Sequence, residues 1–573
     1  MQTRTDPAAA LREAALHLSA GRHAQALAAF KSLAERDPAS LPALAGVAAS
    51  LQHLGRLDEA IAAWQRLIAR APTQVEAHFN ISIAFAQAGR FDRSVSHLRL
   101  VTAQAPGLAA AWANLGYAQR NLGELDNAAT SLEKAIALDP GLADAHNNLG
   151  LVRNDQRRFA EAGEQFRRAL AINPRMAIAM VNLANTEQAE GRLGDAEARY
   201  REALALDPGI AIAHYNLAHL SHKSGRLEEA IAGYRAAIAL DPGYEQANQN
   251  LGDAMLLLRR WQEGWRGYAW RPPRLLHAEK LHAQGREYAL PDKDGLLTKL
   301  LAIHGEQGLG DVLFFLRFAP ALKARGARLA FIGEARLLPL LERTGLFDRL
   351  LDRDRALGLA DAAEVLAGDL PLLVAATDGD PLPPPLRIEP LPAALESVRA
   401  VLAGFGPPPY IGVTWRAGEP RSGLLDRLFK QAPLTGLGAA LRKLPATLVS
   451  VQRAPTAAEV GEIEAACGSR VHDGSALNHD LEQALALMAL LDDYAGVSNT
   501  NMHLRAGVGR TARVLVPFPP EWRWTAAGNS PWFPRFAVYR QDSGHSWDNA
   551  LGRLAADLAS APAPSPSLAK GTP

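Results

Sequence analysis

The chain has 573 residues, a formal net charge of +1, and 48% hydrophobic and 21% charged residues. This length predicts roughly three or four units of about 150 residues, and the balanced charge gives no reason to expect nucleic acid or an anionic membrane surface as a partner. The single cysteine, Cys467, excludes a disulfide framework within the chain, and no Cys/His spacing is typical of a metal site. No apolar run approaches the ~20 residues that cross a bilayer, and none follows Met1 as in a leader. We therefore expect a cytoplasmic protein without an integral membrane segment.

A 34-residue period organises the N-terminal half. Prolines mark every step, at Pro38, Pro72, Pro106, Pro140, Pro174, Pro208 and Pro242. Small residues keep the same interval, at Ala26, Ala60, Ser94, Ala128, Ala162, Ala196 and Ala230. Glycines keep a third register, with Arg157 in the one gap: Gly21, Gly55, Gly89, Gly123, Gly191 and Gly225. Glycine permits the turn between two helices, a small residue lets them pack closely, and proline ends the second helix. The period predicts stacked antiparallel helix pairs, which form a superhelix because one pair cannot bury its own apolar side.

These units resemble the tetratricopeptide repeat, as in the segment Ala111–Gly116 followed by Gly123, Ala128 and Pro140. Seven full units run from about residue 7 to residue 244. An eighth, degraded unit follows and carries Trp261, Trp265 and Trp270. The predicted repeat superhelix therefore occupies residues 1–278.

One polar position also keeps the 34-residue interval. It is occupied by Asn80, Asn114, Asn148, Asn182, Asn216 and Asn250. Asparagine is a mediocre helix former, so the series needs a cause. We expect this position to face the concave groove, where a side-chain amide offers a donor and an acceptor to an extended peptide. The series is similar to the asparagine ladder of the O-linked N-acetylglucosamine transferase repeats. Hydrogen bonding between repeats is the alternative explanation.

After residue 278 the period stops, and strands alternate with helices. A first layer, residues 279–395, has predicted strands at 300–303 and 328–332 and helices at 312–324 and 337–341. A second layer, residues 396–560, has strands at 411–415, 447–451, 496–497 and 514–516 and helices at 434–442, 457–466 and 481–491. This alternation predicts parallel sheets covered by helices. The Pro/Ser/Ala-rich residues 561–573 are predicted to form a disordered tail.

A glycine-rich turn, residues 304–311, joins the first predicted strand of this half to a helix. Gly308 and Gly310 let the backbone bend and approach a phosphate or an acceptor closely. Asp311 ends the turn with a carboxylate that can take a proton. The turn is not a Walker loop, since no Gly-Lys-Ser/Thr follows, and it lacks the full dinucleotide fingerprint. The alternative is a tight strand-to-helix turn with Asp311 as the N-cap.

Four short blocks follow one another between residues 261 and 541. They are Glu306–Asp311, Val413–Trp415, Ser450–Gln452 and Met502–Leu504. In order and spacing they resemble the blocks of bacterial tetratricopeptide proteins whose catalytic half is related to the heptosyltransferases, glycosyltransferase family 9. The resemblance implies a GT-B fold of two Rossmann-like layers, with the acceptor on the first layer and the nucleotide sugar on the second. It implies an inverting, metal-independent glycosyltransferase without a cofactor, in which Asp311 is the base for the acceptor hydroxyl.

The same resemblance assigns the donor site. Lys430 would contact the donor diphosphate, and His503 would lie beside it at the start of a helix, whose N-terminus binds anions. The predicted donor-binding residues are Thr414, Lys430, Gln452, Asn499, Thr500, Asn501, Met502 and His503. The alternatives are a solvated loop lysine and a capping or packing histidine. The family usually has an aspartate, held to contact the sugar, five residues before this histidine. Ser498 stands there in this chain, so either the donor differs or the activity is impaired.

Three weaker signals stay open. Trp522, Trp524 and Trp532 either stack on a base or sugar or pack on the second layer. Asp378 and Asp380 resemble a metal-binding Asp-x-Asp pair but are expected to be solvated. Gln452 and Arg453 end a predicted strand and either touch the donor or lie on the surface.

We interpret the chain as a glycosyltransferase that moves a sugar from a nucleotide-sugar donor to an acceptor, expected to be a polypeptide presented by the repeats. The alternative is a non-catalytic repeat-based interaction scaffold with a degenerate transferase domain. Ser498 favours the scaffold, whereas the retained Glu306–Asp311 block and His503 favour the enzyme. The fold by itself does not decide between them.

Overall fold

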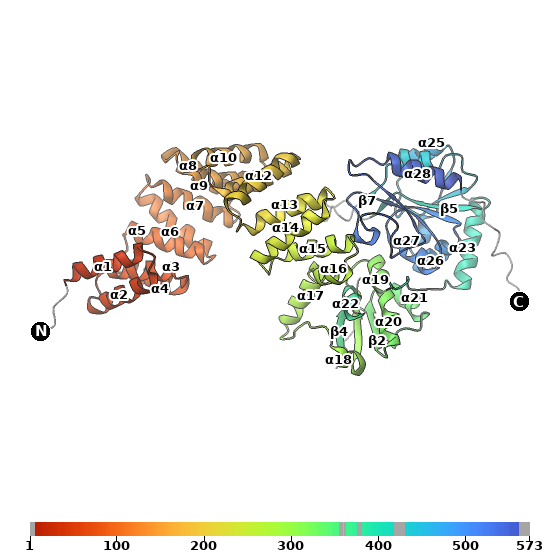
Figure 1. Cartoon of the computed structure of the whole chain (residues 1–573), viewed down its shortest axis with the longest axis horizontal. Helices are drawn as coiled ribbons and strands as arrows, with labels where there is room; N and C mark the ends of the chain where they lie inside the picture. Colours follow the sequence, from red (N-terminus) through yellow and green to blue (C-terminus); the bar gives the residue numbers. More distant parts are fainter. Residues whose placement is uncertain (1–5, 355–358, 360–361, 375–380, 418–429, 561–573) are drawn as a thin grey trace. The chain divides into compact units, whose positions relative to one another are not determined.

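The computed structural model describes residues 6–354, 359, 362–374, 381–417 and 430–560 (Figure 1). The chain forms two compact units, Met1–Asn216 (unit 1) and Leu217–Pro573 (unit 2). Asp378, Asp380 and the predicted tail lie outside the described residues. The predicted boundary at residue 278 falls inside unit 2, because the last repeat helices share one apolar core with the sheets.

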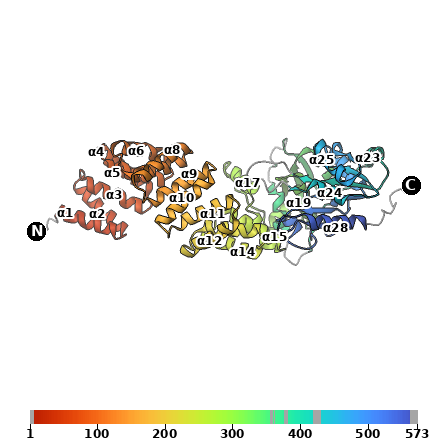
Figure 2. The same ribbon diagram turned by 90° about the horizontal axis from the view of Figure 1, so that it is seen from above.

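Unit 1 is a series of helix pairs (Figure 2). The helices are α1 (Pro7–Ser19), α2 (His23–Arg36), α3 (Leu41–His53), α4 (Leu57–Arg70), α5 (Val75–Gln87), α6 (Phe91–Gln104), α7 (Ala109–Asn121), α8 (Leu125–Leu138), α9 (Ala143–Asp155), α10 (Phe159–Ile172), α11 (Ala177–Ala189), α12 (Leu193–Leu206) and α13 (Ala211–Lys223), which contains the boundary between the units. Each even-numbered helix ends two residues before a periodic proline, and the periodic small residues are all buried. The predicted helical repeat superhelix is therefore confirmed.

The turn inside each pair uses the left-handed region of the backbone. The five glycines at this position in unit 1 have φ between 71° and 80°, and Arg157, in the gap, has φ of 59°. A Cβ makes this conformation costly. We therefore expect Arg157→Gly to raise the free energy of unfolding of unit 1 by about 0.5–1 kcal/mol, measured by chemical denaturation. Arg158→Gly is the matched control and should lower it, because Arg158 has φ of −92° and pairs with Glu161. An unchanged midpoint for Arg157→Gly would contradict the argument.

Unit 2 begins with the last repeat helices, α14 to α16, and two further helices. They are α14 (Leu227–Leu240), α15 (Glu245–Leu257), α16 (Trp261–Tyr268), α17 (Pro272–His282) and α18 (Lys293–Thr298). The predicted degraded repeat corresponds to α15 and α16, whose backbones almost touch. A Cβ built on Gly252 would lie 2.6 Å from backbone atoms of Gly267 and Tyr268. Only glycine allows this approach.

Two parallel sheets follow, as the alternation predicts. The first has the order β3-β2-β1-β4 and consists of β1 (Leu300–His304), β2 (Arg328–Gly333), β3 (Arg349–Asp352) and β4 (Ala363–Leu366). The second has the order β12-β11-β10-β5-β8-β9 and consists of β5 (Tyr410–Thr414), β8 (Thr447–Ser450), β9 (Val471–Asp473), β10 (Asp493–Val497), β11 (Arg513–Val516) and β12 (Ala537–Arg540). The short strands β6 (Arg416–Ala417) and β7 (Lys430–Gln431) pair antiparallel.

Helices cover these sheets (Figure 1). They are α19 (Leu309–Phe315), α20 (Ala319–Ala324), α21 (Leu338–Glu342), α22 (Leu370–Val374), α23 (Pro392–Phe405), α24 (Leu434–Ala440), α25 (Ala457–Cys467), α26 (Leu481–Leu490), α27 (Thr500–Gly507) and α28 (Asp548–Ala559), with 3-10 helices η1 (Leu316–Phe318), η2 (Ala335–Leu337), η3 (Ala367–Asp369), η5 (Ser475–Asn478) and η6 (Trp522–Trp524). The predicted helix 312–324 is divided into α19, η1 and α20. Pro320 stands in the first turn of α20, where its missing N–H is tolerated.

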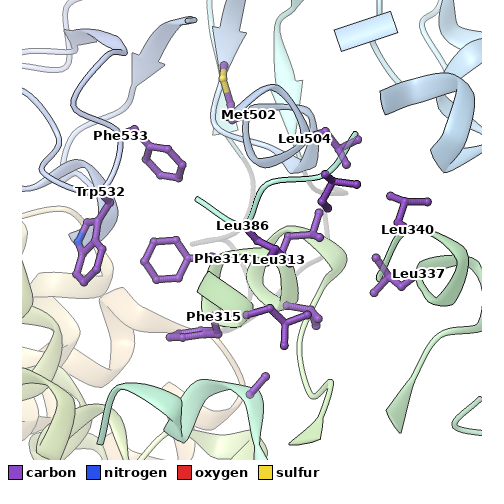
Figure 3. Packing of buried hydrophobic residues seen from close by; sticks show 14 of the residues in the cluster. Leu313, Phe314, Phe315, Leu337, Leu340, Leu386, Met502, Leu504, Trp532 and Phe533 are labelled. Atoms are coloured by element: carbon purple, nitrogen blue, oxygen red, sulfur yellow. The ribbon is translucent and has the colours of Figure 1, made fainter. Parts of the chain in front are cut away.

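One apolar core joins the repeat end to both sheet layers. Figure 3 shows Phe314 and Phe315 of α19 close to Trp532, and Met502 and Leu504 of α27 in the same cluster. This core holds the two helices that follow β1 and β10 against each other.

The three tryptophans of the loop after β11 belong to this core. Trp522, Trp524 and Trp532 are at most 7% exposed. The ring centroid of Trp265 on α16 lies 5.2 Å from that of Trp522 and 5.8 Å from that of Trp532. The interpretation that these rings stack on a base or sugar is therefore corrected. Trp522 and Trp532 pack between α16 and α19, and Trp524 stacks on Phe533 and Phe536 of the same loop, so that the large apolar area of each ring is buried.

Candidate active site

Two helix N-termini meet at the glycine turn. β1 leads through the turn into α19, and β10 leads into α27, whose N-cap is Asn499. A Cβ built on Gly310 would lie 3.0 Å from Cδ2 of His503 and 3.4 Å from Cα of Thr500. Gly310 therefore allows the close approach of α19 to α27.

Asp311 lies in the first turn of α19, and the N-cap is Gly308. The alternative in which Asp311 is the N-cap is therefore wrong. A Cβ built on Gly308 would meet only Asp311 Oδ2, at 3.7 Å, so space does not require glycine there. The Asp311 side chain is 33% exposed.

Four charged side chains, Asp311, Arg523, Glu521 and Lys430, form what we call the charge chain. Arg523 Nη2 donates to Asp311 Oδ1, and Arg523 Nη1 lies 3.7 Å from Glu521 Oε2. Lys430 Nζ lies 2.5 Å from Glu521 Oε1 and donates to the backbone oxygen of Ser498 at 3.3 Å. Asp311 follows the first sheet and Lys430 belongs to the second layer, so the charge chain connects the predicted acceptor and donor sides.

Arg523 is held between aromatic rings. Its guanidinium carbon lies 4.5 Å from the ring centroid of Trp522 and 5.0 Å from that of Phe314. Burial acts to lower the pKa of Arg523, but the carboxylates of Asp311 and Glu521 raise it above its ordinary value. Its buried Nε has no hydrogen-bond partner among the described residues. Arg523 is therefore a fixed cation with one unused donor.

His503 is neutral in this environment. Burial, followed by the nearby charges of Arg523, Arg317 and Lys430, lowers the pKa of His503 well below its ordinary value. This environment disfavours a positive charge on His503, whereas a neutral imidazole still offers a hydrogen bond.

Thr414 and Asn499 bond to each other instead of projecting into open space. Thr414 Oγ1 lies 2.8 Å from Tyr494 Oη and accepts from Asn499 Nδ2 at 3.1 Å. Asn499 Oδ1 accepts from the backbone N–H of Asn501 at 3.0 Å. These groups build the turn before α27, and their contact with the donor stays a prediction.

Gln452 and Met502 are also used within the fold. Gln452 Oε1 accepts from the backbone N–H groups of Trp415 and Arg416 at 3.1 Å and 3.0 Å. Met502 is 0% exposed, and its N–H donates to Asn499 O. Neither residue is placed to contact a donor. Arg453, beside Gln452, is exposed.

Thr500 and Ser498 flank this turn differently. Thr500 is partly exposed at the first position of α27, and its hydroxyl has no recorded partner in the described part of the chain. Ser498 is 4% exposed. Ser498 supplies no carboxylate at the position of the family's aspartate. The carboxylate beside Lys430 is that of Glu521, which is distant in sequence.

The first half of the glycine turn is anchored to the repeat end. Arg271 Nη2 donates to Glu306 Oε1 at 2.6 Å, and Arg271 Nη1 donates to Asp369 Oδ1 at 2.7 Å. Gln307 Nε2 donates to Tyr268 Oη at 2.9 Å. Burial raises the pKa of Glu306, although Arg271 opposes the shift. Glu306 and Gln307 therefore hold the turn against the repeat end, whereas Gly310 and Asp311 lie in its second half, next to α27 and Arg523.

The asparagine series divides into two groups. Asn182 Nδ2 donates to Asn147 Oδ1 at 2.9 Å, and Asn216 Nδ2 donates to Asn185 Oδ1 at 2.8 Å. These bonds fit the alternative of hydrogen bonding between repeats, and Asn250 is buried at 4% exposure. The other three, Asn80, Asn114 and Asn148, are partly exposed and have no recorded side-chain hydrogen bond in the part that the structure describes. The hypothesis that the asparagines bind an extended peptide therefore applies only to Asn80, Asn114 and Asn148, on α5, α7 and α9.

The described ranges contain neither a helical membrane span nor a cluster of metal ligands. No helix among them is long and apolar enough to cross a bilayer. No group of three or more His, Cys, Asp or Glu side chains in the same ranges is arranged to hold a metal ion.

Known proteins resemble mainly the helical half. The family described as the Cilia and flagella-associated protein 70 C-terminal domain, a tetratricopeptide repeat family, matches residues 39–252. The chain carries a tetratricopeptide-like repeat domain. Its helix pairs and their 34-residue step agree with this assignment.

Protein FlbA of Caulobacter vibrioides is 26% identical over 327 residues, which are 53% of each chain. The chain thus spans about half the length of this curated relative. Among solved structures, the APC/C hetero-tetramer Cut9-Hcn1 gives a TM-score of 0.38 at 20% identity, over 42% of this chain and 48% of that one. A tetratricopeptide repeat protein from Parabacteroides merdae gives 0.39 at 14% identity, over 43% and 97%.

Sequence reasoning missed Glu521 and Arg523. The signal was available in the order Glu521-Trp522-Arg523-Trp524, where two charges alternate with two aromatic rings. Two aromatic residues that alternate with one acidic and one basic residue are typical of an ion pair buried in a core. Charged side chains are rarely buried unless they have a partner of opposite charge.

Proposed function

We propose that the chain is a glycosyltransferase whose active site is the charge chain together with Thr500 and His503. The observation that supports this most is the meeting of one carboxylate, Asp311, with two cations and the N-terminus of α27, beyond the carboxyl ends of β1 and β10. Ligands of parallel sheets bind at these ends. Sugar transfer needs a base at the acceptor hydroxyl and positive charge at the leaving diphosphate.

In the proposed reaction, Asp311 accepts the proton of the acceptor hydroxyl. The hydroxyl oxygen bonds to the anomeric carbon of the sugar, and the bond from that carbon to the diphosphate oxygen breaks. The electron pair leaves with the nucleoside diphosphate, which Lys430 and the partial positive charge at the N-terminus of α27 stabilise. The resemblance to glycosyltransferase family 9 supports a GT-B, inverting reaction without a metal.

The proposed acceptor is a polypeptide bound by the repeat domain. Replacing Asn80, Asn114 and Asn148 together with alanine should raise the acceptor KM about tenfold or more, since each lost hydrogen bond costs about 0.5–1.5 kcal/mol. The kcat should not change, because the bond is equally present in the ground and transition states. Asn182→Ala, which loses a bond to Asn147, is the control. An unchanged acceptor KM in the triple variant would remove the ladder from the proposal.

The proposal is tested by release of nucleoside diphosphate from a panel of nucleotide sugars, with and without cell lysate as a source of acceptor. Release that depends on lysate and is absent in Asp311→Ala would support a transferase and identify its donor. If no donor is turned over and calorimetry detects no bound nucleotide, the transferase proposal fails.

A second candidate is an interaction scaffold with an inactive transferase domain. It is favoured by Ser498 in place of the family's aspartate and by the pairing of Lys430 and Arg523 with carboxylates of the chain itself. In that case the repeat domain would carry the function, and variants of Asp311 would leave partner binding unchanged.

A further inference from the structure

We propose that Glu521 and Arg523 are positioning residues that couple the base Asp311 to the diphosphate site at Lys430, so that the donor binds before the base is released. The inference rests on the proposed function. It concerns residues to which neither the sequence motifs nor the resemblance gives a role.

The charges alternate in sign along the charge chain, which can therefore act as a relay between Lys430 and Asp311. Lys430 and Arg523 both contact Glu521, at 2.5 Å and 3.7 Å, and Arg523 also holds Asp311. Without a donor, each cation therefore has a carboxylate partner, and the four charges sum to zero. The base Asp311 stays bonded to Arg523 as long as no other carboxylate pairs more closely with Arg523.

A diphosphate at Lys430 changes this balance. Its negative charge competes with Glu521 for the ammonium group and repels the carboxylate. Glu521 and Arg523 flank Trp522 at the start of η6, so the displaced carboxylate is already next to Arg523. A closer Glu521–Arg523 pair weakens the hold of Arg523 on Asp311 and leaves that carboxylate free to accept a proton.

The surroundings of Arg523 favour an exchange of partners over a large movement. The guanidinium is stacked at 4.5 Å and 5.0 Å from the centroids of Trp522 and Phe314, and its side chain is 10% exposed. Other groups that act on Arg523 are Tyr268 and Asp253 on the repeat helices, and Arg317 and His503, whose own pKa values it lowers. They lie outside the relay and should affect all its variants alike.

Linkage provides a test that needs no acceptor. If diphosphate binding loosens Asp311, then neutralising Asp311 must tighten diphosphate binding by the same factor. Calorimetry with uridine, guanosine, adenosine and thymidine diphosphates should show about fivefold tighter binding, or more, for Asp311→Asn than for the wild type. Asp311→Asn should not tighten diphosphate binding when Glu521→Gln is also present, because the uncharged glutamine no longer connects Lys430 to Arg523.

Arg523→Lys is a second variant that interrupts the relay. Lysine keeps the positive charge but lacks the planar guanidinium group that bridges the carboxylates of Asp311 and Glu521. It should also remove the effect of Asp311→Asn. Thermal unfolding of each variant checks that it is folded. A gain of equal size in the wild-type and Glu521→Gln backgrounds would mean direct repulsion between Asp311 and the ligand, and would overturn the coupling. No gain at all would also overturn it. If the wild type binds none of the four nucleotides, the proposed function fails together with the inference, which is a distinguishable result.

Discussion

Replacing Asp311 with asparagine should lower acceptor-dependent release of nucleoside diphosphate by about 10²–10⁴-fold, the usual contribution of a general base. Asparagine has the shape of aspartate and can still accept a hydrogen bond from Arg523, but it cannot take the proton of the acceptor hydroxyl. The kcat and kcat/KM values should fall together, because the lost interaction is made in the transition state. Steady-state kinetics with the donor that the wild type turns over measures both.

The matched control is Glu396→Gln, which removes one negative charge from an exposed position on α23. Its rate should equal that of the wild type. If Asp311→Asn retained more than about a tenth of the activity, far above the loss expected for a base, Asp311 would not be the base, and another group would have to take the proton.

Arg271→Met should lower the free energy of unfolding of unit 2 by about 3–5 kcal/mol, the usual cost of breaking a buried ion pair from one side. Arg271 is 2% exposed and bonds to both Glu306 and Asp369, which are 6% and 0% exposed. Without the guanidinium, two carboxylates remain buried with fewer partners. Denaturant unfolding followed by tryptophan fluorescence measures the loss, because Trp261, Trp265 and Trp522 report on this core.

The control for this loss is Arg286→Met, which breaks the pair with Glu364 at a position where the arginine is 52% exposed. Such a pair contributes only about 0–1 kcal/mol.

The pH dependence of the loss in Arg271→Met gives a second check. The pKa of Glu306 is already raised by burial, and losing Arg271 raises it further. A carboxyl whose pKa is higher in the folded state destabilises the fold as pH rises above its unfolded value. The deficit of Arg271→Met should therefore shrink when the pH falls from about 7 to about 5, and a constant deficit would exclude Glu306 as its source.

Much of the fold follows from local patterns. The proline step fixes where the even-numbered helices from α2 to α12 end, because proline cannot continue a helix. The glycine step fixes the left-handed turns so firmly that even Arg157 adopts one. The β1 strand reads as a short apolar run before turn residues, whereas the predicted strand 496–497 covers only the end of β10 (Asp493–Val497). The division of residues 312–324 was not predicted, because apolar periodicity continues through Pro320.

The candidate site was predicted less completely. Asp311 and His503 were identified from their blocks and Lys430 from the family resemblance, and the charge chain links Lys430 to Asp311 beside α27. Their partners were not, because Glu521 and Arg523 lie in a loop about 200 residues after Asp311. Gln452 and Met502 were assigned to the donor because they stand beside motif residues. Sequence proximity does not show which atoms are already bonded.

The sequence by itself determined the repeat period, the two sheet layers and the carboxylate at the start of α19, since each depends on residues close together in the chain. Only the tertiary structure decided that the last repeat helices share the core of the sheets, that His503 is neutral, and that Arg523 holds Asp311. These three depend on which distant segments meet. Burial and Coulomb interactions are set by distances in space, and no local pattern specifies them.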